Sequence, residues 1–213
     1  MFKAVLWDFG GVITTSPFEA FNRYEADKGL PRDVIRSINA TNPEDNAWAR
    51  LESSRIDVDE FDELFAAEAK ALGHEIRGKD VLALLSGDIR PEMVNALKTI
   101  SQAHRIGCIT NNVKSGEGPG MARSASKAEA IAGVMELFDI VIESSKVGMR
   151  KPDPRIYQLA CSEMDIDPGE AIFLDDLGIN LKPAKALGMT TIKVLSAEQA
   201  LDDLEQHLGI PLR

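Results

Sequence analysis

The chain has 213 residues, of which 44% are hydrophobic, and its 34 acidic and 24 basic residues leave a formal net charge of −10. This length suits one domain, or one domain with an insertion, and the acidic balance disfavours a nucleic-acid or anionic-membrane surface. No apolar run reaches membrane-spanning length, and Cys108 and Cys161 show no metal or redox spacing. We therefore expect a soluble protein of the cytoplasm, with no nucleic-acid or membrane partner.

The first predicted element is a buried strand that ends in a carboxylate. Residues 4–7 (AVLW) form a short apolar run, Asp8 ends it, and Gly10-Gly11 follows at once. A run this short, stopped by turn residues, is typical of a strand buried in a parallel sheet. Because open α/β folds bind ligands at the carboxyl ends of their strands, Asp8 is the first candidate functional residue.

A block of helices is expected next, because no convincing strand pattern occurs between Ser16 and Gly87. Ser16, Pro17 and Glu19 together predict a helix start of the capping-box type. Later helices are predicted to open at Pro31, at Asn42-Pro43 and at Asp57, with a short fifth helix at 81–85. We expect an all-helical insertion over residues 16–87, carried by a core that comprises residues 1–15 and 88–213.

From Arg90 onward, short apolar runs alternate with helical patterns. The runs predict strands at 106–109, 140–142, 171–174 and 191–194, and helices are expected to open at Arg90-Pro91, Ala128, Asp153-Pro154, Asn180 and Ser196. The Gly-, Ser- and Lys-rich stretch 113–126 is predicted to be a mobile loop. With the first strand, this pattern predicts an α/β fold: a three-layer, Rossmann-like core with a central parallel sheet of about five strands.

Polar residues follow several of these strands and should meet at one edge of the sheet. They are Asp8, Thr110-Asn111 and Asp175-Asp176, with Lys151 in the loop after another strand. Three carboxylates so close would repel one another, and a hard cation such as Mg²⁺ relieves that repulsion. Taken alone, Asp175-Asp176 would suit a helix N-terminus, where the helix dipole stabilises acidic groups. The proximity of Asp8 favours the metal.

Four motifs carry a family resemblance. DFGGV at 8–12, Thr110-Asn111, Lys151-Pro152 and Asp175-Asp176, in this order, resemble the motifs of the haloacid dehalogenase-like (HAD) hydrolases. Each motif is weak alone, but four in order at strand ends are specific, and the match spans nearly the whole chain. The stretches 147–158 and 173–189 most closely resemble the N-terminal phosphatase domain of soluble epoxide hydrolases and the related bacterial sugar-phosphate phosphatases. The insertion is similar to the small helical cap of the family.

The resemblance implies a Mg²⁺-dependent phosphatase of a small phosphorylated metabolite. In such an enzyme the aspartate at position 8 attacks phosphorus, and water hydrolyses the resulting aspartyl-phosphate. The implied roles are metal binding by Asp8, the Gly10 backbone oxygen and Asp176, with Asp175 bound or close by; phosphoryl binding by Thr110, Asn111 and Gly11; charge compensation by Lys151; and orientation of the acidic pair by Asn180. The enzyme is expected to be a monomer or a homodimer.

Residue 10 departs from the family pattern. Phosphatases of this family usually have a second aspartate there as general acid and base, whereas this chain has Gly10. General acid catalysis contributes about 10²- to 10⁴-fold in rate, so substrates with good leaving groups should be favoured, unless a residue such as Glu52 or a water substitutes. Two alternatives stay open at this point: a metal-independent 2-haloacid dehalogenase, and a non-catalytic binding or regulatory module.

Overall fold

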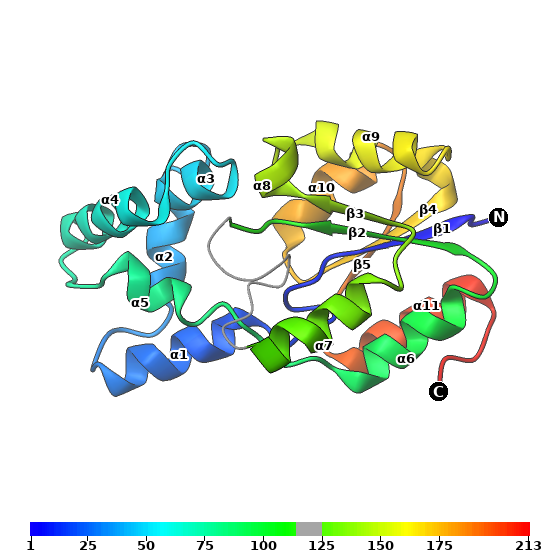
Figure 1. The fold of residues 1–213 in the computed structure, drawn as a ribbon, viewed down its shortest axis with the longest axis horizontal. Helices are drawn as coiled ribbons and strands as arrows, with labels where there is room; N and C mark the ends of the chain where they lie inside the picture. Colours follow the sequence, from blue (N-terminus) through cyan, green and yellow to red (C-terminus); the bar gives the residue numbers. More distant parts are fainter. Residues whose placement is uncertain (114–124) are drawn as a thin grey trace.

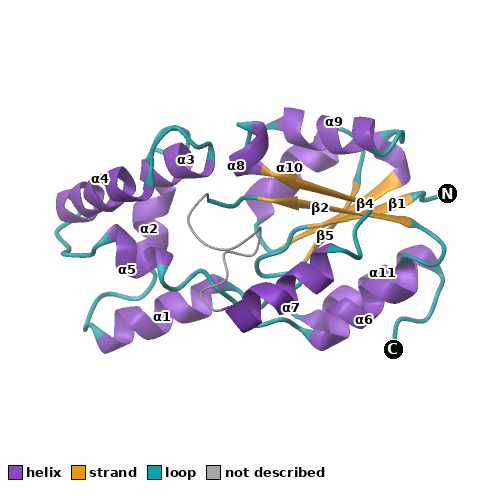
Figure 2. Ribbon diagram, in the orientation of Figure 1, coloured by secondary structure: helices purple, strands orange, loops and turns teal. Residues whose placement is uncertain are grey.

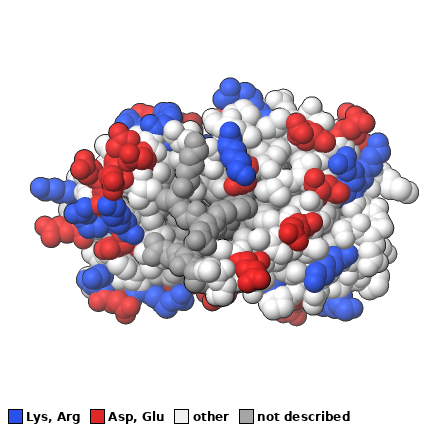
Figure 3. Space-filling model, in the orientation of Figure 1, with Lys and Arg blue, Asp and Glu red and all other residues white. Residues whose placement is uncertain are grey.

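A computed structural model describes residues 1–113 and 125–213 of the chain (Figure 1). The predicted mobile loop at 113–126 therefore lies almost wholly outside the described residues. In the described part of the chain, no helix has both the length and the apolar character that crossing a bilayer requires. On the face seen in Figure 3, acidic and basic side chains are interspersed, and the described residues of this face form no continuous basic stripe.

Five short strands form one parallel sheet in the order β3-β2-β1-β4-β5. They are β1 (Ala4–Trp7), β2 (Arg105–Thr110), β3 (Ile140–Glu143), β4 (Ala171–Asp175) and β5 (Thr190–Lys193). The central strand β1 is buried along its whole length and pairs with β2 on one side and β4 on the other. The direction of the winding changes at β1 and β4, and ligands of open α/β folds bind at such a switch point.

Helices cover both faces of the sheet (Figure 2). Helices α6 (Pro91–Ile100), α7 (Ala125–Met135) and α11 (Ala197–Leu208) pack on one face. Helices α9 (Pro154–Glu163) and α10 (Gly178–Ala186) pack on the other, and the short α8 (Ser144–Val147) follows β3. The predicted three-layer α/β core with a parallel five-stranded sheet is confirmed. Because each strand is only four to six residues long, its end residues are carried directly to the edge of the core.

The remaining helices form a group beside the carboxyl ends of the strands (Figure 1). They are α1 (Pro17–Asp27), α2 (Val34–Ala40), α3 (Ala47–Glu52), α4 (Val58–Ala71) and α5 (Gly78–Leu82). Their apolar residues form a hydrophobic cluster of their own, centred on Phe61 and Phe65. The chain enters and leaves this group through adjacent segments, since Thr14 and Ile89 form an antiparallel bridge. The division into 16–87 and the rest stays a prediction.

Several predictions about helix starts are wrong: the second helix begins at Val34 rather than at Pro31, and the fifth begins at Gly78 rather than at residue 81. The third helix begins at Ala47 rather than near Asn42, because Asn46 caps it: its Oδ1 accepts a hydrogen bond from Ala49 N at 2.8 Å. Helix α1 begins at Pro17 as predicted, but the Ser16 side chain makes no capping hydrogen bond. Its hydroxyl is directed to Asp176 instead, at 3.1 Å. A serine that the sequence assigns to a helix end therefore belongs to the strand-end cluster.

The buried Asp62 ties α4 to α5. Its Oδ1 accepts hydrogen bonds from Lys79 N at 2.9 Å and Arg77 Nε at 3.2 Å, and its Oδ2 contacts the same guanidinium. These bonds, above all those from Arg77, outweigh the effect of burial and lower the pKa of Asp62 to about 2.

We predict that Asp62→Asn lowers the free energy of unfolding at pH 7 by about 1–3 kcal/mol, the scale of a charge-assisted hydrogen bond. Because folding lowers this pKa, the contribution is complete above about pH 4 and disappears as pH falls toward 2. Thermal unfolding of both proteins between pH 7 and pH 3 measures it. Asp59→Asn, which removes an exposed ion pair to Lys79, is the control and should change little. If the difference in unfolding free energy between the parent protein and Asp62→Asn does not vary with pH, the stabilising role of the charged Asp62 is contradicted.

Candidate active site

Asp8 lies in the first turn after β1, at the carboxyl edge of the sheet. Its backbone N–H donates to Leu174 O at 2.8 Å, which continues the pairing of β1 with β4. Asp8 is 8% exposed as a residue, and its Oδ1 accepts hydrogen bonds from Phe9 N at 2.7 Å and Lys151 Nζ at 2.8 Å. The carboxylate is therefore fixed in rotation, and it lines a cleft between the sheet edge and the helical group.

Lys151 is the cation of the site. It precedes α9, is 1% exposed, and its ammonium group lies 2.8 Å from both Asp8 Oδ1 and Asp175 Oδ2. Burial by itself would lower the pKa of Lys151, but the two carboxylates outweigh it and raise the pKa well above its ordinary value. Lys151 therefore stays charged and joins the end of β1 to the end of β4.

Asp175 and Asp176 are adjacent in sequence but differ in their surroundings. Asp175 is fully buried, and both of its oxygens accept hydrogen bonds. Leu177 N donates to Oδ1 at 2.8 Å, and Lys151 Nζ donates to Oδ2. Asn180 Nδ2 lies within hydrogen-bond distance of both oxygens, at 3.1 and 3.0 Å. Asp176 lines the cleft, and its Oδ2 accepts a hydrogen bond from Ser16 Oγ. The geometry makes Asp175 the anchor of Lys151 and leaves Asp176 available to a ligand.

Among the residues that the structure describes, the carboxylates of the site carry more negative charge than Lys151 can balance. Asp8, Asp175 and Asp176 offer oxygens that all lie within 4.8 Å of one another. Burial, followed by the charge of Asp175, raises the pKa of Asp176 to about 6, and burial raises the pKa of Asp8 well above its ordinary value. A hard divalent cation with oxygen ligands relieves such repulsion. The donor set fits Mg²⁺, with Asp8 and Asp176 as the carboxylates that face the cleft.

The two glycines after Phe9 have different geometry. Gly11 has a φ of +79°, and a Cβ there would lie 2.2 Å from Asp176 Oδ2, so a larger residue would displace this carboxylate. Gly10 has no such strain, and a Cβ built on it meets no atom of the described residues within 4 Å. Residue 10 also lines the cleft. A side chain at position 10 would therefore fit, and its absence is a property of the sequence rather than of the fold.

Thr110 ends β2, Asn111 follows it, and both line the same cleft. The Asn111 side chain is engaged by the main chain of Lys151: Oδ1 accepts from Lys151 N at 2.9 Å, and Nδ2 donates to Lys151 O at 3.0 Å. The predicted site residues thus converge, but the amide of Asn111 positions the lysine loop. Phosphoryl binding by Thr110, Asn111 and Gly11 stays a prediction.

The cleft has a volume of about 360 Å³. Its wall on the helical side is largely apolar, with Phe18, Phe21 and Trp48 among the lining residues. Arg36 also lines it, and the guanidinium lies 4.4 Å from the centre of the Phe18 ring.

Two residues that support the site, Ser16 and Asn112, are not among the predicted site residues. The position of Ser16 before a proline resembles a helix cap. The buried side chain of Asn112 donates to Glu143 Oε2 at 2.7 Å and accepts from Ser145 N at 3.2 Å, so that the ends of β2 and β3 are held together. Neither contact has a local sequence signal, because the partners are distant in the chain.

Comparison with known proteins points to one family. A family model described as "haloacid dehalogenase-like hydrolase" matches residues 2–188. The chain is 32% identical to mouse acyl-CoA dehydrogenase family member 10 over 99% of its own length and 20% of the relative's. It is 30% identical to bifunctional epoxide hydrolase 2 of Sus scrofa over 99% of its length and 39% of the relative's. The chain therefore spans less than half of these relatives.

Shorter relatives and solved structures agree on the fold. Validoxylamine A 7'-phosphate phosphatase of Streptomyces hygroscopicus subsp. limoneus is 27% identical, with 94% of this chain and 89% of the relative covered. A HAD-family enzyme from Bacteroides thetaiotaomicron, in complex with magnesium and inorganic phosphate, superposes with a TM-score of 0.58 at 20% sequence identity. The superposition covers 91% of this chain and 94% of that enzyme. L-2-haloacid dehalogenase from Xanthobacter autotrophicus superposes with a TM-score of 0.61 at 21% sequence identity. The superposition covers 97% of this chain and 83% of the dehalogenase.

We predict that Lys151→Met lowers the free energy of unfolding at pH 7 by about 3–5 kcal/mol, because it leaves Asp8 and Asp175 buried without a counter-charge. Urea unfolding measures this loss. The control is Lys79→Met, which removes an ion pair whose lysine is 55% exposed and should have little effect. Equal stability of the Lys151 variant and the parent protein would show that Lys151 does not hold the site together.

Proposed function

The chain belongs to the haloacid dehalogenase-like hydrolases, and on this basis we propose that it is a Mg²⁺-dependent phosphatase that acts on a small phosphorylated metabolite. The observation that carries the proposal is the buried Lys151, which bridges Asp8 and Asp175 beside the cleft-lining Asp176. Phosphoryl transfer depends on positioning and charge neutralisation more than on covalent chemistry, and this cluster provides both.

In the proposed mechanism, the Asp8 carboxylate attacks phosphorus and the bond from phosphorus to the leaving oxygen breaks. Lys151 and the Phe9 N–H hold the nucleophile in place. Asp8, the Gly10 carbonyl oxygen and Asp176 would hold Mg²⁺, which would supply neutralisation of the phosphoryl charge. Thr110 and the backbone near Gly11 would bind phosphoryl oxygens, while Asn180 keeps Asp175 on Lys151. Water then hydrolyses the aspartyl-phosphate and restores Asp8.

Gly10 limits both steps. Without a carboxyl group at position 10, no side chain there protonates the leaving oxygen, and none activates the water that cleaves the aspartyl-phosphate. Good leaving groups make the first step independent of an acid. We therefore propose that the substrate has a good leaving group, as aryl phosphates, acyl phosphates and sugar 1-phosphates do.

The cleft favours an aryl group among these. Several polar residues of the cleft are committed to protein partners: Asn46 Nδ2 donates to Asn39 O at 2.7 Å, Asn111 holds Lys151, and Asn180 holds Asp175. The aromatic wall at Phe18, Phe21 and Trp48 offers an apolar surface against which an aryl leaving group can pack.

The dehalogenase alternative is supported by the fold likeness to L-2-haloacid dehalogenase, which is one of fold only. The acidic pair weighs against it, because Asp176 beside Asp8 would repel the carboxylate of a 2-haloacid. We also propose that residues 16–87 cap a core of residues 1–15 and 88–213, supported by the bridge between Thr14 and Ile89. A cytoplasmic location and a monomeric or homodimeric state complete the proposal.

We predict that the purified protein hydrolyses 4-nitrophenyl phosphate with Mg²⁺ and not with EDTA. Asp8→Asn should reduce kcat by at least about 10³-fold, as expected when a nucleophile is removed. Release of 4-nitrophenol measures both effects. Chloride release from 2-chloropropionate in EDTA, or phosphatase activity that survives Asp8→Asn, would contradict the proposal.

We further predict that Gly10→Asp raises kcat/KM for phenyl phosphate by about 10²- to 10⁴-fold, the range of general acid catalysis. The effect on 4-nitrophenyl phosphate should be smaller, because that leaving group needs less protonation. Phosphate release from both substrates gives the comparison. Gly10→Asn is the matched control, since it has nearly the same shape but cannot donate the proton of a carboxylic acid. Equal gains in the two variants would remove Gly10 as the cause of the restriction.

A further inference from the structure

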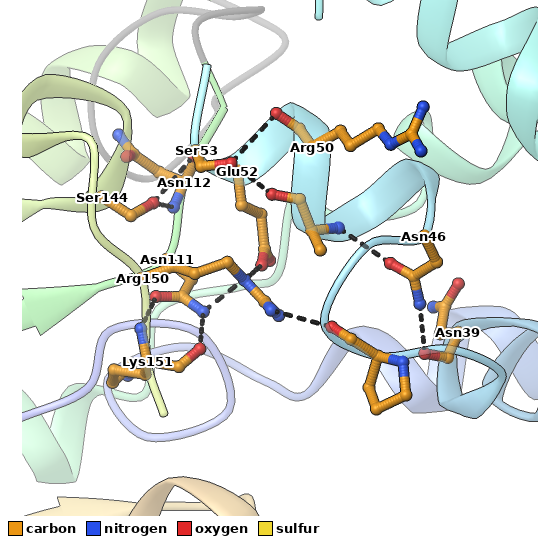
Figure 4. Close-up of polar contacts among 12 residues, drawn as sticks. Asn39, Asn46, Arg50, Glu52, Ser53, Asn111, Asn112, Ser144, Arg150 and Lys151 are labelled. Carbon is orange, nitrogen blue, oxygen red and sulfur yellow. Dashed lines mark hydrogen bonds and ion pairs between the residues drawn. The ribbon is translucent and has the colours of Figure 1, made fainter. Parts of the chain in front are cut away.

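An ion pair joins the helical group to the loop that carries Lys151. Glu52, the last residue of α3, accepts a hydrogen bond on Oε2 from Arg150 Nε at 2.7 Å (Figure 4). The two side chains are 17% and 26% exposed, so the pair is shielded more than a surface ion pair. Arg150 is covalently adjacent to Lys151, and Glu52 and Arg150 both line the cleft.

Arg150 contacts the helical group at two points. Besides its hydrogen bond to Glu52, Arg150 donates from its Nη1 to Pro43 O at 3.2 Å, so that one guanidinium binds both the segment before α3 and the end of α3. A further hydrogen bond lies nearby, from Ser54 Oγ, just after α3, to Ser145 O at 3.0 Å. Helix α3, which carries Trp48 of the cleft wall, is therefore attached to the 145–151 segment through side-chain hydrogen bonds.

The same Glu52 oxygen reaches Lys151 through Asn111. Asn111 Nδ2 donates to Glu52 Oε2 at 3.3 Å and to Lys151 O at 3.0 Å, and its Oδ1 accepts from Lys151 N (Figure 4). One amide side chain thus contacts both the helical group and the main chain of the charged lysine. A shift of Glu52 would remove one of the two acceptors that fix the Asn111 amide.

We propose that Glu52 and Arg150 are positioning residues of this site: they hold α3 against the Lys151 loop and, through Asn111, fix the main chain of Lys151. The kinetic part of this inference rests on the proposed phosphatase function. In this role Glu52 does not replace the missing acid at residue 10, because its Oε2 is bound by the Arg150 guanidinium and the Asn111 amide. A positioning residue affects all substrates alike, whereas a general acid matters most for poor leaving groups.

The kinetic test compares 4-nitrophenyl phosphate with phenyl phosphate. Glu52→Ala should lower kcat/KM by about 10-fold or more, as misplaced catalytic groups do, and by the same factor for both substrates. Glu52→Gln should keep most of the activity, because its amide oxygen still accepts from Arg150 and Asn111. Arg55→Ala is the matched control: it removes an ion pair to Asp45 in the adjacent turn and should change nothing.

Hydrogen exchange of the Lys151 amide is a test that does not depend on activity. Glu52→Ala should accelerate this exchange relative to the parent protein and to Arg55→Ala, since the Asn111 acceptor is less fixed. If exchange is unchanged in Glu52→Ala, or if Glu52→Gln fails mainly with phenyl phosphate, the inference is wrong. If the parent protein hydrolyses neither phosphate, the proposed function fails, and the exchange rates still decide whether Glu52 positions the loop.

Discussion

The ammonium group of Lys151, held 2.8 Å from Asp8 and Asp175, is the interaction on which the site depends. The sheet brings the two carboxylates together because β1 pairs with β4 at the switch point of the fold. Asn180 holds Asp175, and the Tyr157 hydroxyl donates to Asn180 O at 2.7 Å, so the helices α9 and α10 brace the arrangement. In the part of the chain that the structure describes, Lys151 alone cannot neutralise the three carboxylates, and this remaining charge is the physical reason to expect a divalent cation.

Much of the core could be predicted from the sequence because its signals are local. Short apolar runs that end at Asp8, Thr110 and Asp175 identify buried parallel strands, and parallel strands carry their end residues to one edge of the sheet. The roles of neighbouring residues were harder to predict. Asp175 and Asp176 are indistinguishable in sequence, yet one is fully buried on Lys151 and the other lines the cleft. Ser16 and Glu52 act through partners 160 and 98 residues away, and no local pattern encodes such contacts.

The helical group gives the site its selectivity in this account. It supplies the aromatic wall, and it touches the Lys151 loop through Glu52 and Pro43. Binding of a leaving group against α3 would therefore act on the same loop that holds the nucleophile. The absence of a carboxyl group at Gly10 adds a chemical restriction to the geometric restriction that the helical group imposes. It affects formation and hydrolysis of the aspartyl-phosphate unequally. A good leaving group makes formation of the aspartyl-phosphate fast, whereas its hydrolysis still lacks a base at position 10.

Because the two steps differ in this way, pre-steady-state kinetics can test whether Asp8 is the nucleophile of a phosphatase that lacks the usual acid and base. Rapid mixing of the protein and Mg²⁺ with 4-nitrophenyl phosphate should release a burst of about one 4-nitrophenol per site. A slower steady rate should follow, and acid quenching should trap phosphate on the peptide that contains Asp8. Gly10→Asp should shorten or abolish the burst by accelerating hydrolysis. Steady release without a burst, together with no phosphate on the Asp8 peptide, would contradict the account.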